Sequence, residues 1–365
     1  MRAEQGDRLE TLLGSCIAVI LTDPRRTTAV GTARAARSVW TNPVLWRETC
    51  TKAHGRAMIV VRIAWLLLFA AAAPRASAQD GCDRACLTRF VDAWFKGLTT
   101  HSATGIPVAR DVRITQNGQT TTLAGTFWAN AESVPYRWDI ANVRLGDTGT
   151  EAVVRNADGT MTMLSVRLKV KNNTITEVET IKANKGEADG LWGPDVLVQK
   201  GVSPALQLSI REAERDSYYR LIGAAEGYWR AFQTNGTPAY HPADLLPDTQ
   251  RFENGLQTTG VVRNGAYASA SGGFDEGRFL GRNLWDRRYP VVDEERGIVL
   301  SIVRFGLKAG AKSQSVATSN DRLVGEFFAV QKGYLSEIHA VLFNLPDEKP
   351  TGWPADYGPG RAATE

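Results

Sequence analysis

The sequence is poor in the side chains that most often bind catalytic metals or form redox centres. Histidine and cysteine occur four times each in 365 residues, and the histidines beyond residue 78 (His101, His241 and His339) lie far apart in the chain. A metal site would need ligands from distant segments, so none is predicted. The chain also lacks Gly-x-Gly-x-x-Gly, Gly-x-x-x-x-Gly-Lys, His-Glu-x-x-His and Gly-x-Ser-x-Gly. These motifs mark dinucleotide-binding proteins, P-loop enzymes, zinc proteases and serine hydrolases, so we expect any chemistry to be acid–base work without a cofactor.

A secretion signal stands in an unusual place, at residues 58–78. Arg62 precedes an apolar run over residues 63–73, a proline ends the run, and a small-residue triplet closes at Ala78. This is the order of a signal peptide and its cleavage site. The run is about half as long as a membrane-spanning helix needs. We predict cleavage after Ala78, a periplasmic or secreted protein with no membrane anchor after cleavage, and a non-native extension over residues 1–57.

Charge and cysteine content change when this leader is removed. Residues 1–78 hold 11 of the 43 basic side chains and 5 of the 39 acidic ones, which leaves 32 basic and 34 acidic. This balance gives no electrostatic reason to expect nucleic acid or an anionic membrane surface as a partner. Cys82 and Cys86 remain, four residues apart. In an oxidising compartment they could form a disulfide at a helix start; the alternative is two free thiols near the terminus.

A weak internal repeat sets the predicted architecture. Two pairs of segments align without gaps, residues 170–181 with 330–341, and residues 91–98 with 225–232. The first pair has the pattern of closing hairpins, with Asn172-Asn173 and Lys332-Gly333 as two-residue turns. The second pair has apolar and aromatic residues at helical spacing. Each half should therefore contain a helix, a loop, several strands and a closing hairpin.

The boundaries follow from composition and capping signals. We expect a first domain over residues 79–184, a linker over 185–204, a second domain over 205–348 and an irregular tail over 349–365. The first helix should run from Asp83 to near Thr100, and the second from a capping box, Ser209-x-x-Glu212, to about Thr234. The stretch 264–282 is rich in glycine, serine and alanine, which favours a long loop or lid.

Several segments resemble a family of secreted fungal and bacterial proteins of unknown function built from nuclear transport factor 2-like (SnoaL-like) domains. The resemblance rests on the segments 82–87, 112–119, 168–181 and 286–297 and on Gly352-Trp353. It implies an α+β fold of two tandem cone-shaped domains, each with helices packed on a strongly bent antiparallel sheet. The family brings no activity and therefore no catalytic residues. SnoaL-like domains in general include cyclases, isomerases, hydrolases and lyases that need no cofactor.

Two histidines of the second half are candidate acid–base residues. In the closing strand Glu337, His339 and Val341 share one face, so His339 could serve as general base or acid and Glu337 could contact substrate. The alternative is a hydrogen-bonded histidine on the solvent face. His241 follows the second helix in a proline-rich loop, where it could be catalytic or could cap or pack.

The densest polar and aromatic cluster is Trp285-Asp286-Arg287-Arg288-Tyr289. A carboxylate beside two guanidinium groups and a phenol could orient a substrate oxygen or stabilise an enolate, with Asp286 as the catalytic member. The alternative is a structural group of salt bridges that holds the long loop. Tyr228, on the second helix, is either core or a hydroxyl that points into the cone.

Two functions of different classes remain open. The first is a cofactor-independent lyase, isomerase or hydrolase acting on a small, largely apolar and possibly aromatic substrate, for example a lignin-derived phenolic. The second is a non-catalytic secreted or periplasmic protein that binds a small molecule. A monomer or a homodimer is expected.

Overall fold

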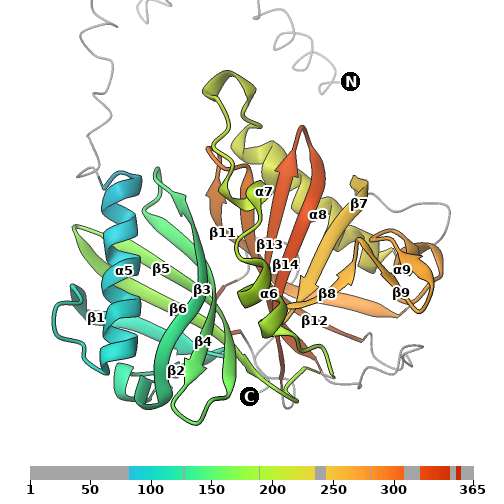
Figure 1. The fold of residues 1–365 in the computed structure, drawn as a ribbon. Helices are drawn as coiled ribbons and strands as arrows, with labels where there is room; N and C mark the ends of the chain where they lie inside the picture. Colours follow the sequence, from blue (N-terminus) through green and yellow to red (C-terminus); the bar gives the residue numbers. More distant parts are fainter. Residues whose placement is uncertain are drawn as a thin grey trace, which may run out of the picture. The chain divides into compact units, whose positions relative to one another are not determined.

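The computed structural model describes residues 82–125, 128–188, 190–234, 244–279, 281–307, 321–345 and 351–354, all within one compact unit, Gln79–Glu365. The described chain is an α+β structure with two six-stranded sheets (Figure 1). No helix among the described residues is long and apolar enough to cross a membrane. The predicted secretion signal and His241 both lie outside the described residues.

The first half of this unit consists of one long helix and one sheet. Its elements are α5 (Arg84–Thr100), β1 (Val108–Gln116), β2 (Gln119–Thr121), η1 (Leu123–Gly125), η2 (Trp128–Asn130), β3 (Ala131–Asn142), β4 (Asp147–Asn156), β5 (Met161–Lys171) and β6 (Thr174–Asn184). The strands lie in the order β2-β1-β6-β5-β4-β3.

The second half repeats this plan with an insertion. Its elements are α8 (Tyr218–Gln233), β7 (Leu245–Glu253), β8 (Leu256–Thr259), β9 (Val261–Arg263), β10 (Ala266–Ala268), α9 (Gly272–Asp275), β11 (Arg282–Asp293), β12 (Ile298–Leu307), β13 (Arg322–Gln331) and β14 (Tyr334–Asn344). The sheet order is β8-β7-β14-β13-β12-β11, which is the order of the first sheet with each strand replaced by its counterpart.

Both sheets are mixed, which corrects the expectation of purely antiparallel sheets. In each half the first strand lies beside the last and runs parallel to it, β1 against β6 and β7 against β14. The other neighbours pair antiparallel. The short strand β2 or β8 occupies one edge of its sheet, and the long strand β3 or β11 occupies the other. From that far edge the following strands cross the sheet, and the last one lies beside the first strand.

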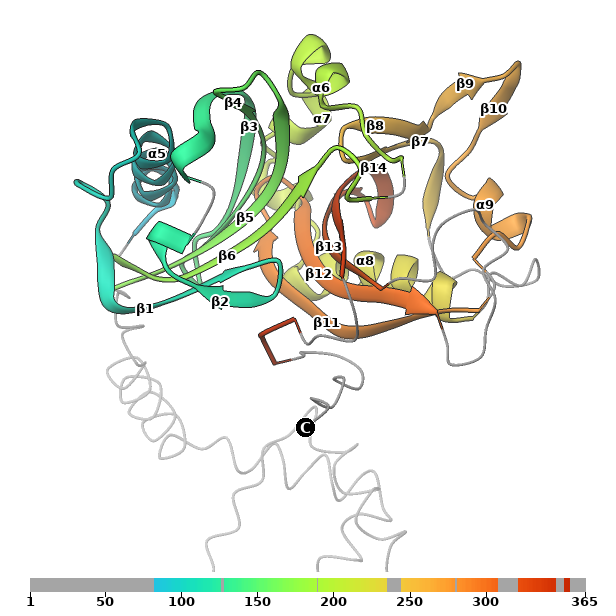
Figure 2. The same ribbon diagram turned by 90° about the horizontal axis from the view of Figure 1, so that it is seen from below.

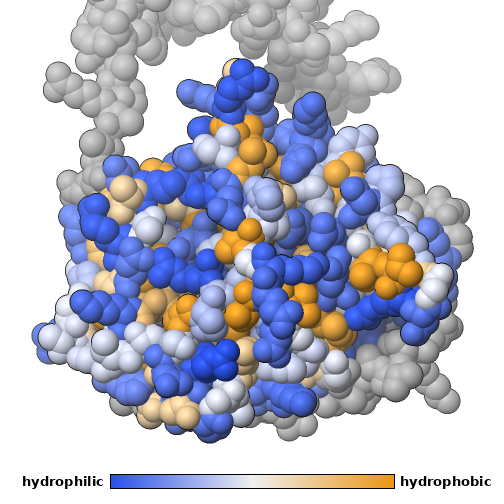
Figure 3. Space-filling view, viewed as in Figure 1, coloured by the Kyte–Doolittle hydropathy of each residue, from blue (hydrophilic) through white to orange (hydrophobic). Residues whose placement is uncertain are grey.

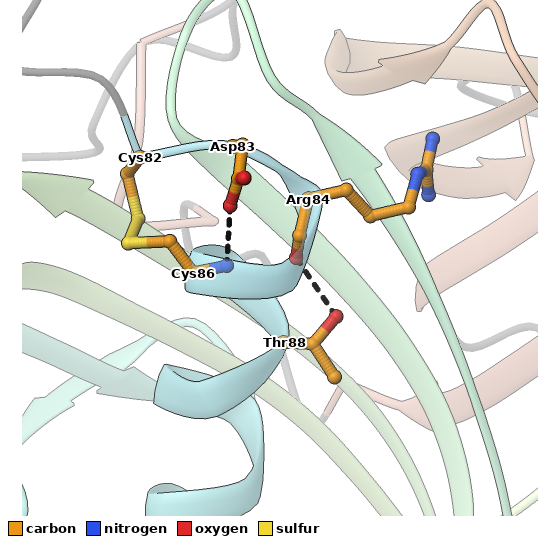
Figure 4. The surroundings of a disulfide bond; sticks show 5 residues. All are labelled: Cys82, Asp83, Arg84, Cys86 and Thr88. Atoms are coloured by element: carbon orange, nitrogen blue, oxygen red, sulfur yellow. Dashed lines mark hydrogen bonds between the residues drawn. A yellow bond between two sulfur atoms is a disulfide. The ribbon is translucent and has the colours of Figure 1, made fainter.

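The start of α5 confirms the predicted boundary. Asp83 caps the helix, because its carboxylate accepts a 2.8 Å hydrogen bond from the Cys86 amide. Cys82 and Cys86 form a disulfide across this first turn, with Cα atoms 5.0 Å apart (Figure 4). The last helical residue is Thr100. The next residue, His101, caps the helix in the left-handed region with a φ of 53°.

The closing hairpins also have the predicted turns. Asn172 and Asn173 both have positive φ, 51° and 55°, and Lys332 and Gly333 have 54° and 85°. Two consecutive positive φ angles are those of the type I′ turn, whose twist suits a two-residue hairpin. The turns therefore fix the register of β5 on β6 and of β13 on β14.

The predicted start of the second helix was wrong. The helix begins at Tyr218 after Ser217, and residues 212–214 form only a 3-10 turn, because residues 207–215 offer almost no apolar face to bury. Two short helices connect the halves, α6 (Pro194–Lys200) inside the predicted linker and α7 (Pro204–Gln207) at its end, each with proline at its start. The stretch 264–282, expected as a long loop, contains β10, which pairs with β9 just before it, and α9.

The hydrophobic core has three parts. The α5 face of the first sheet and the α8 face of the second sheet each form a core with their own helix. The third part lies between the two sheets and includes Trp138 and Ile140 from the first and Phe252 and Phe327 from the second. Figure 2 shows α5 on the outer side of the first sheet, away from the second. Each sheet is therefore covered on both faces, which explains why the central strands are buried along their whole length.

Candidate functional site

A buried polar group lies among apolar side chains on the α8 face of the second sheet. Along β13, Val324 and Phe328 belong to the core beneath α8, and Glu326 lies on the same face between them. Arg251 and Glu253 come from β7, and Tyr228 comes from α8. We call Tyr228, Arg251, Glu253 and Glu326 the Glu326 cluster.

Polar contacts link three members of the Glu326 cluster, and charge couples the fourth to them. The Arg251 Nη1 donates to the Tyr228 hydroxyl at 3.2 Å, and Arg251 pairs with the Glu253 carboxylate at 3.2 Å. The Glu326 carboxyl interacts electrostatically with Tyr228, Arg251 and Glu253. The side chains of Arg251 and Glu253 are 12% and 16% exposed, whereas Glu326 is only 4% exposed. The cluster thus runs from a solvent-contacting end at Glu253 to a buried end at Glu326.

Burial sets the protonation of the Glu326 cluster. It raises the pKa of Glu326 to about 8, although the nearby Arg251 guanidinium opposes the shift; the Glu253 carboxylate adds to it. Burial also raises the pKa of Tyr228. At neutral pH Glu326 is therefore mainly a neutral carboxylic acid beside a guanidinium, and a proton given up by this acid leaves a carboxylate that Arg251 stabilises.

The first half carries apolar residues at the corresponding positions. The internal repeat and the matching strand order show which positions are equivalent. Trp94 of the first half corresponds to Tyr228 of the second, Ile114 to Arg251 and Val166 to Glu326. All three are at most 4% exposed and belong to one hydrophobic core. The fold is therefore complete without polar groups at these positions, and a buried ionic group is rarely kept for stability.

Aromatic rings surround Tyr228. Its ring makes edge contacts with Trp229, Phe232, Phe274 and Phe328 at centroid distances between 5.1 and 5.9 Å. Phe274 comes from α9 in the inserted segment, which therefore packs over the α8 side of the second half. The polar cluster is thus bordered by an apolar, aromatic wall.

His339 lies on the opposite face of the same sheet, between the two halves. Glu337, His339 and Val341 share one face as predicted, and that face packs against the first sheet. The His339 Nδ1 and Nε2 each make 2.8 Å hydrogen bonds, to Glu151 and Glu337, and Trp138 Nε1 donates to Glu151 at 2.7 Å. The ring is 2% exposed and stacks on Phe252.

The charges around His339 hold it protonated. Burial lowers its pKa, but the carboxylates of Glu151 and Glu337 outweigh this and raise it to about 9. Burial acts to raise the pKa of Glu337, and the hydrogen bond from His339 overcomes it and lowers that pKa. A protonated imidazole between two carboxylates joins the halves and is poorly suited to act as a base near neutral pH.

The residues Trp285–Tyr289 are divided between two places by a break in strand register. Asp286 is buried and has φ of 55° where β11 shifts against β12. Arg287 and Tyr289 contact Glu226 of α8, at 3.3 and 2.5 Å. Arg288 instead makes a bidentate pair with Glu179 of the first half, at 2.9 and 2.5 Å. Trp285 is half-buried in the same strand.

The structure therefore does not assemble the predicted residues into one site. Tyr228 belongs to the Glu326 cluster, His339 and Glu337 lie between the sheets, and Arg288 faces the first half. Within the described part of the chain, no group of three or more histidine, cysteine, aspartate or glutamate residues is arranged to hold a metal ion.

Comparison with known proteins gives a match within the second half. A family model described as a domain of unknown function (DUF8021) matches residues 214–342. This range includes Tyr228, Arg251, Glu253 and Glu326. No curated protein matches the chain.

Sequence reasoning overlooked Arg251, Glu253 and Glu326. One signal was available, because Glu326 is the only ionisable residue in the otherwise apolar stretch 323–330 and replaces Val166 of the repeat. Arg251 and Tyr228 give no such signal, since their proximity to Glu326 depends on how the strands are ordered in the sheet.

Proposed function

We propose that the second half is a cofactor-independent acid–base enzyme, a lyase, isomerase or hydrolase, and that the Glu326 cluster is its catalytic site. One observation carries the proposal. Two copies of one topology differ at three positions that are buried in the first copy, where Trp94, Ile114 and Val166 are replaced by a phenol, a guanidinium and a carboxyl group in the second.

The proposed roles follow from the protonation states. Glu326 donates a proton to a leaving oxygen or to a carbanion of the substrate, and Arg251 stabilises the carboxylate that remains. Tyr228, which accepts a hydrogen bond from Arg251, holds this guanidinium in place. Substrate approaches from the end where Arg251 and Glu253 contact solvent.

The aromatic side chains packed around Tyr228 favour a small, largely apolar substrate, and we propose an aromatic one such as a lignin-derived phenolic. We also propose that each half is a SnoaL-like cone. The shared strand order and the position of the cluster under the long helix support this.

We propose further that the protein is secreted or periplasmic and monomeric. The disulfide Cys82–Cys86 supports an oxidising compartment, and each half supplies the sheet on which the other packs. The mass of the protein isolated from its native host tests the export signal. A chain that begins at Gln79 is expected, and one that begins upstream of Met58 would contradict it.

Non-catalytic capture of a small molecule is the alternative function. The groove described below supports it, because that groove needs no acid–base pair to hold a ligand. The two functions differ in their dependence on Glu326, since binding elsewhere should survive its substitution.

The test is a turnover screen with purified residues 79–365 against phenolic, terpenoid and sugar-derived compounds, followed by mass spectrometry. We expect one compound to be consumed with a new mass appearing. Glu326→Gln should lower the rate at least about 100-fold, as loss of a general acid does. Glu337→Gln, a buried carboxyl on the other face of the sheet, is the control and should keep most of the rate. Equal rates for wild type and Glu326→Gln would refute the assignment.

A further inference from the structure

A groove of about 590 Å³ lies where the two halves meet, away from the Glu326 cluster. One wall comes from the first half and includes Arg113 and Arg167, and the other comes from the second and includes Tyr218, Arg288 and Tyr289. Its volume suits a small organic ligand, and junctions between domains are common binding sites.

The C-terminal segment supplies an aromatic ring to this groove. The Trp353 Nε1 donates a 3.0 Å hydrogen bond to Thr115 Oγ1, and the Arg113 guanidinium donates to the Gly352 carbonyl. Three guanidinium groups then surround the indole, Arg113 at 4.0 Å, Arg167 at 5.3 Å and Arg288 at 5.9 Å from the ring centre. Cation–π contacts with the indole hold these arginine side chains in place.

The inner charges of the groove balance one another. Arg167, Lys169 and Arg288 form ion pairs with three carboxylates, those of Asp147, Glu177 and Glu179. Burial raises the pKa of Asp147 even though Arg167 and Lys169 oppose the shift.

One cation that lines the groove is not neutralised, and a second lies beside the groove. Within the described residues Arg113 has no carboxylate partner, and its guanidinium contacts Trp353 and the Gly352 carbonyl. Arg144, next to the lining residue Leu145, likewise has no described carboxylate partner, and it stacks over the ring of Tyr218 at 4.5 Å. The first-half side of the groove thus has an excess of positive charge.

The Arg288 guanidinium on the opposite wall is already engaged. Arg288 is 5% exposed, its two terminal nitrogens bind Glu179, and its Nε is enclosed by the protein. Arg113 is therefore the guanidinium of the lining that is free of a carboxylate within the described residues.

We propose that this groove is a binding site for a small anionic molecule with a flat apolar part. The anionic group lies beside Arg113, and the flat part lies against Tyr218 and Pro290; all three residues line the groove. A carboxylate on an aromatic ring meets both requirements. This site does not depend on the proposed catalytic function.

The proposal is tested by calorimetry with 2-naphthoate and its uncharged analogue 2-naphthamide on the full mature chain. The naphthoate should bind at least about tenfold more tightly than the amide, which corresponds to one charge-assisted hydrogen bond, and its affinity should fall as salt is added. Arg113→Gln should weaken naphthoate binding about tenfold and leave amide binding unchanged.

Arg110→Gln is the matched control, because Arg110 is an exposed arginine of the same strand outside the groove. It should bind naphthoate as the wild type does. Thermal unfolding of both variants checks that they fold. Equal affinities for the acid and the amide, no binding of either at millimolar concentration, or equal effects of the two substitutions would each overturn the proposal.

Discussion

At the scale of single residues, the proposed function depends mainly on one buried carboxyl group. Glu326 occupies a position that valine fills in the other copy of the fold, and it lies in a core of phenylalanine, valine and leucine side chains. A carboxyl group in such a place lowers stability unless it is protonated. At this position of the fold the second half carries the cost and the first half does not.

This cost should be visible as a dependence of stability on pH. With a pKa near 8 in the folded protein against 4.5 as the ordinary value, the unfolded chain releases the Glu326 proton first as the pH rises. The free energy of unfolding should then fall by about 1.4 kcal/mol per pH unit between pH 5 and pH 8 from this residue.

Glu326→Gln removes that contribution. Urea denaturation should show the variant gaining on the order of 3 kcal/mol relative to wild type between pH 5 and pH 8. Glu132→Gln, at an exposed position of β3, is the control and should change the free energy of unfolding little at either pH. A Glu326→Gln curve parallel to wild type would show that the carboxyl group titrates normally.

His339 shows what the alternation of side chains in a strand predicts and what it leaves open. The alternation of β14 correctly placed Glu337, His339 and Val341 on one face, because side chains of a strand alternate. It did not tell which face meets α8 and which meets the other sheet. Both faces are buried, so the usual contrast between apolar and polar sides is missing.

At the scale of elements, the predictions succeeded where the signal was local. Asp83 caps α5, and the positive φ angles of Asn172, Asn173 and Gly333 are the ones such residues adopt readily. Ser209-x-x-Glu212 matched a capping box equally well but begins no long helix. A cap adds about 1 kcal/mol, which cannot replace the apolar face that begins only near Leu221.

The inserted segment is held by aromatic packing rather than being an open loop. Phe274 of α9 is fully buried, with ring centres 4.8 Å from Phe232 and 4.9 Å from Phe279. Phe274→Ala should lower the free energy of unfolding by about 3–5 kcal/mol. Tyr267→Ala in the same insertion, at a residue that is 52% exposed, should cost less than about 0.5 kcal/mol. Similar losses for both in denaturant titrations would contradict this packing.

At the scale of the whole molecule, two copies of one topology share a core between their sheets. Salt bridges extend this contact. Arg84 at the start of α5 pairs with Asp293 of the second half at 2.6 Å, and Arg288 pairs with Glu179 of the first. The visible surface in Figure 3 is mainly hydrophilic, with hydrophobic residues in small separate patches.

The sequence repeat indicated this duplication but not its consequences. Segments 170–181 and 330–341 revealed two similar halves, and from them the helix and hairpin order follows. The meeting of Tyr228, Arg251 and Glu326 could not be inferred, because the residues are far apart in the chain and the parallel pairing of β7 with β14 brings them together.

The protonation of Glu326 in the folded protein tests the central claim most directly. Carboxyl carbon resonances of glutamate-labelled protein can be followed from pH 4 to pH 10, with Glu326→Gln used to assign the signal. We predict that the Glu326 resonance titrates with a midpoint near pH 8. A midpoint near 4.5, the ordinary value for glutamate, would mean that Glu326 is an ionised partner of Arg251 at neutral pH and cannot be the proton donor.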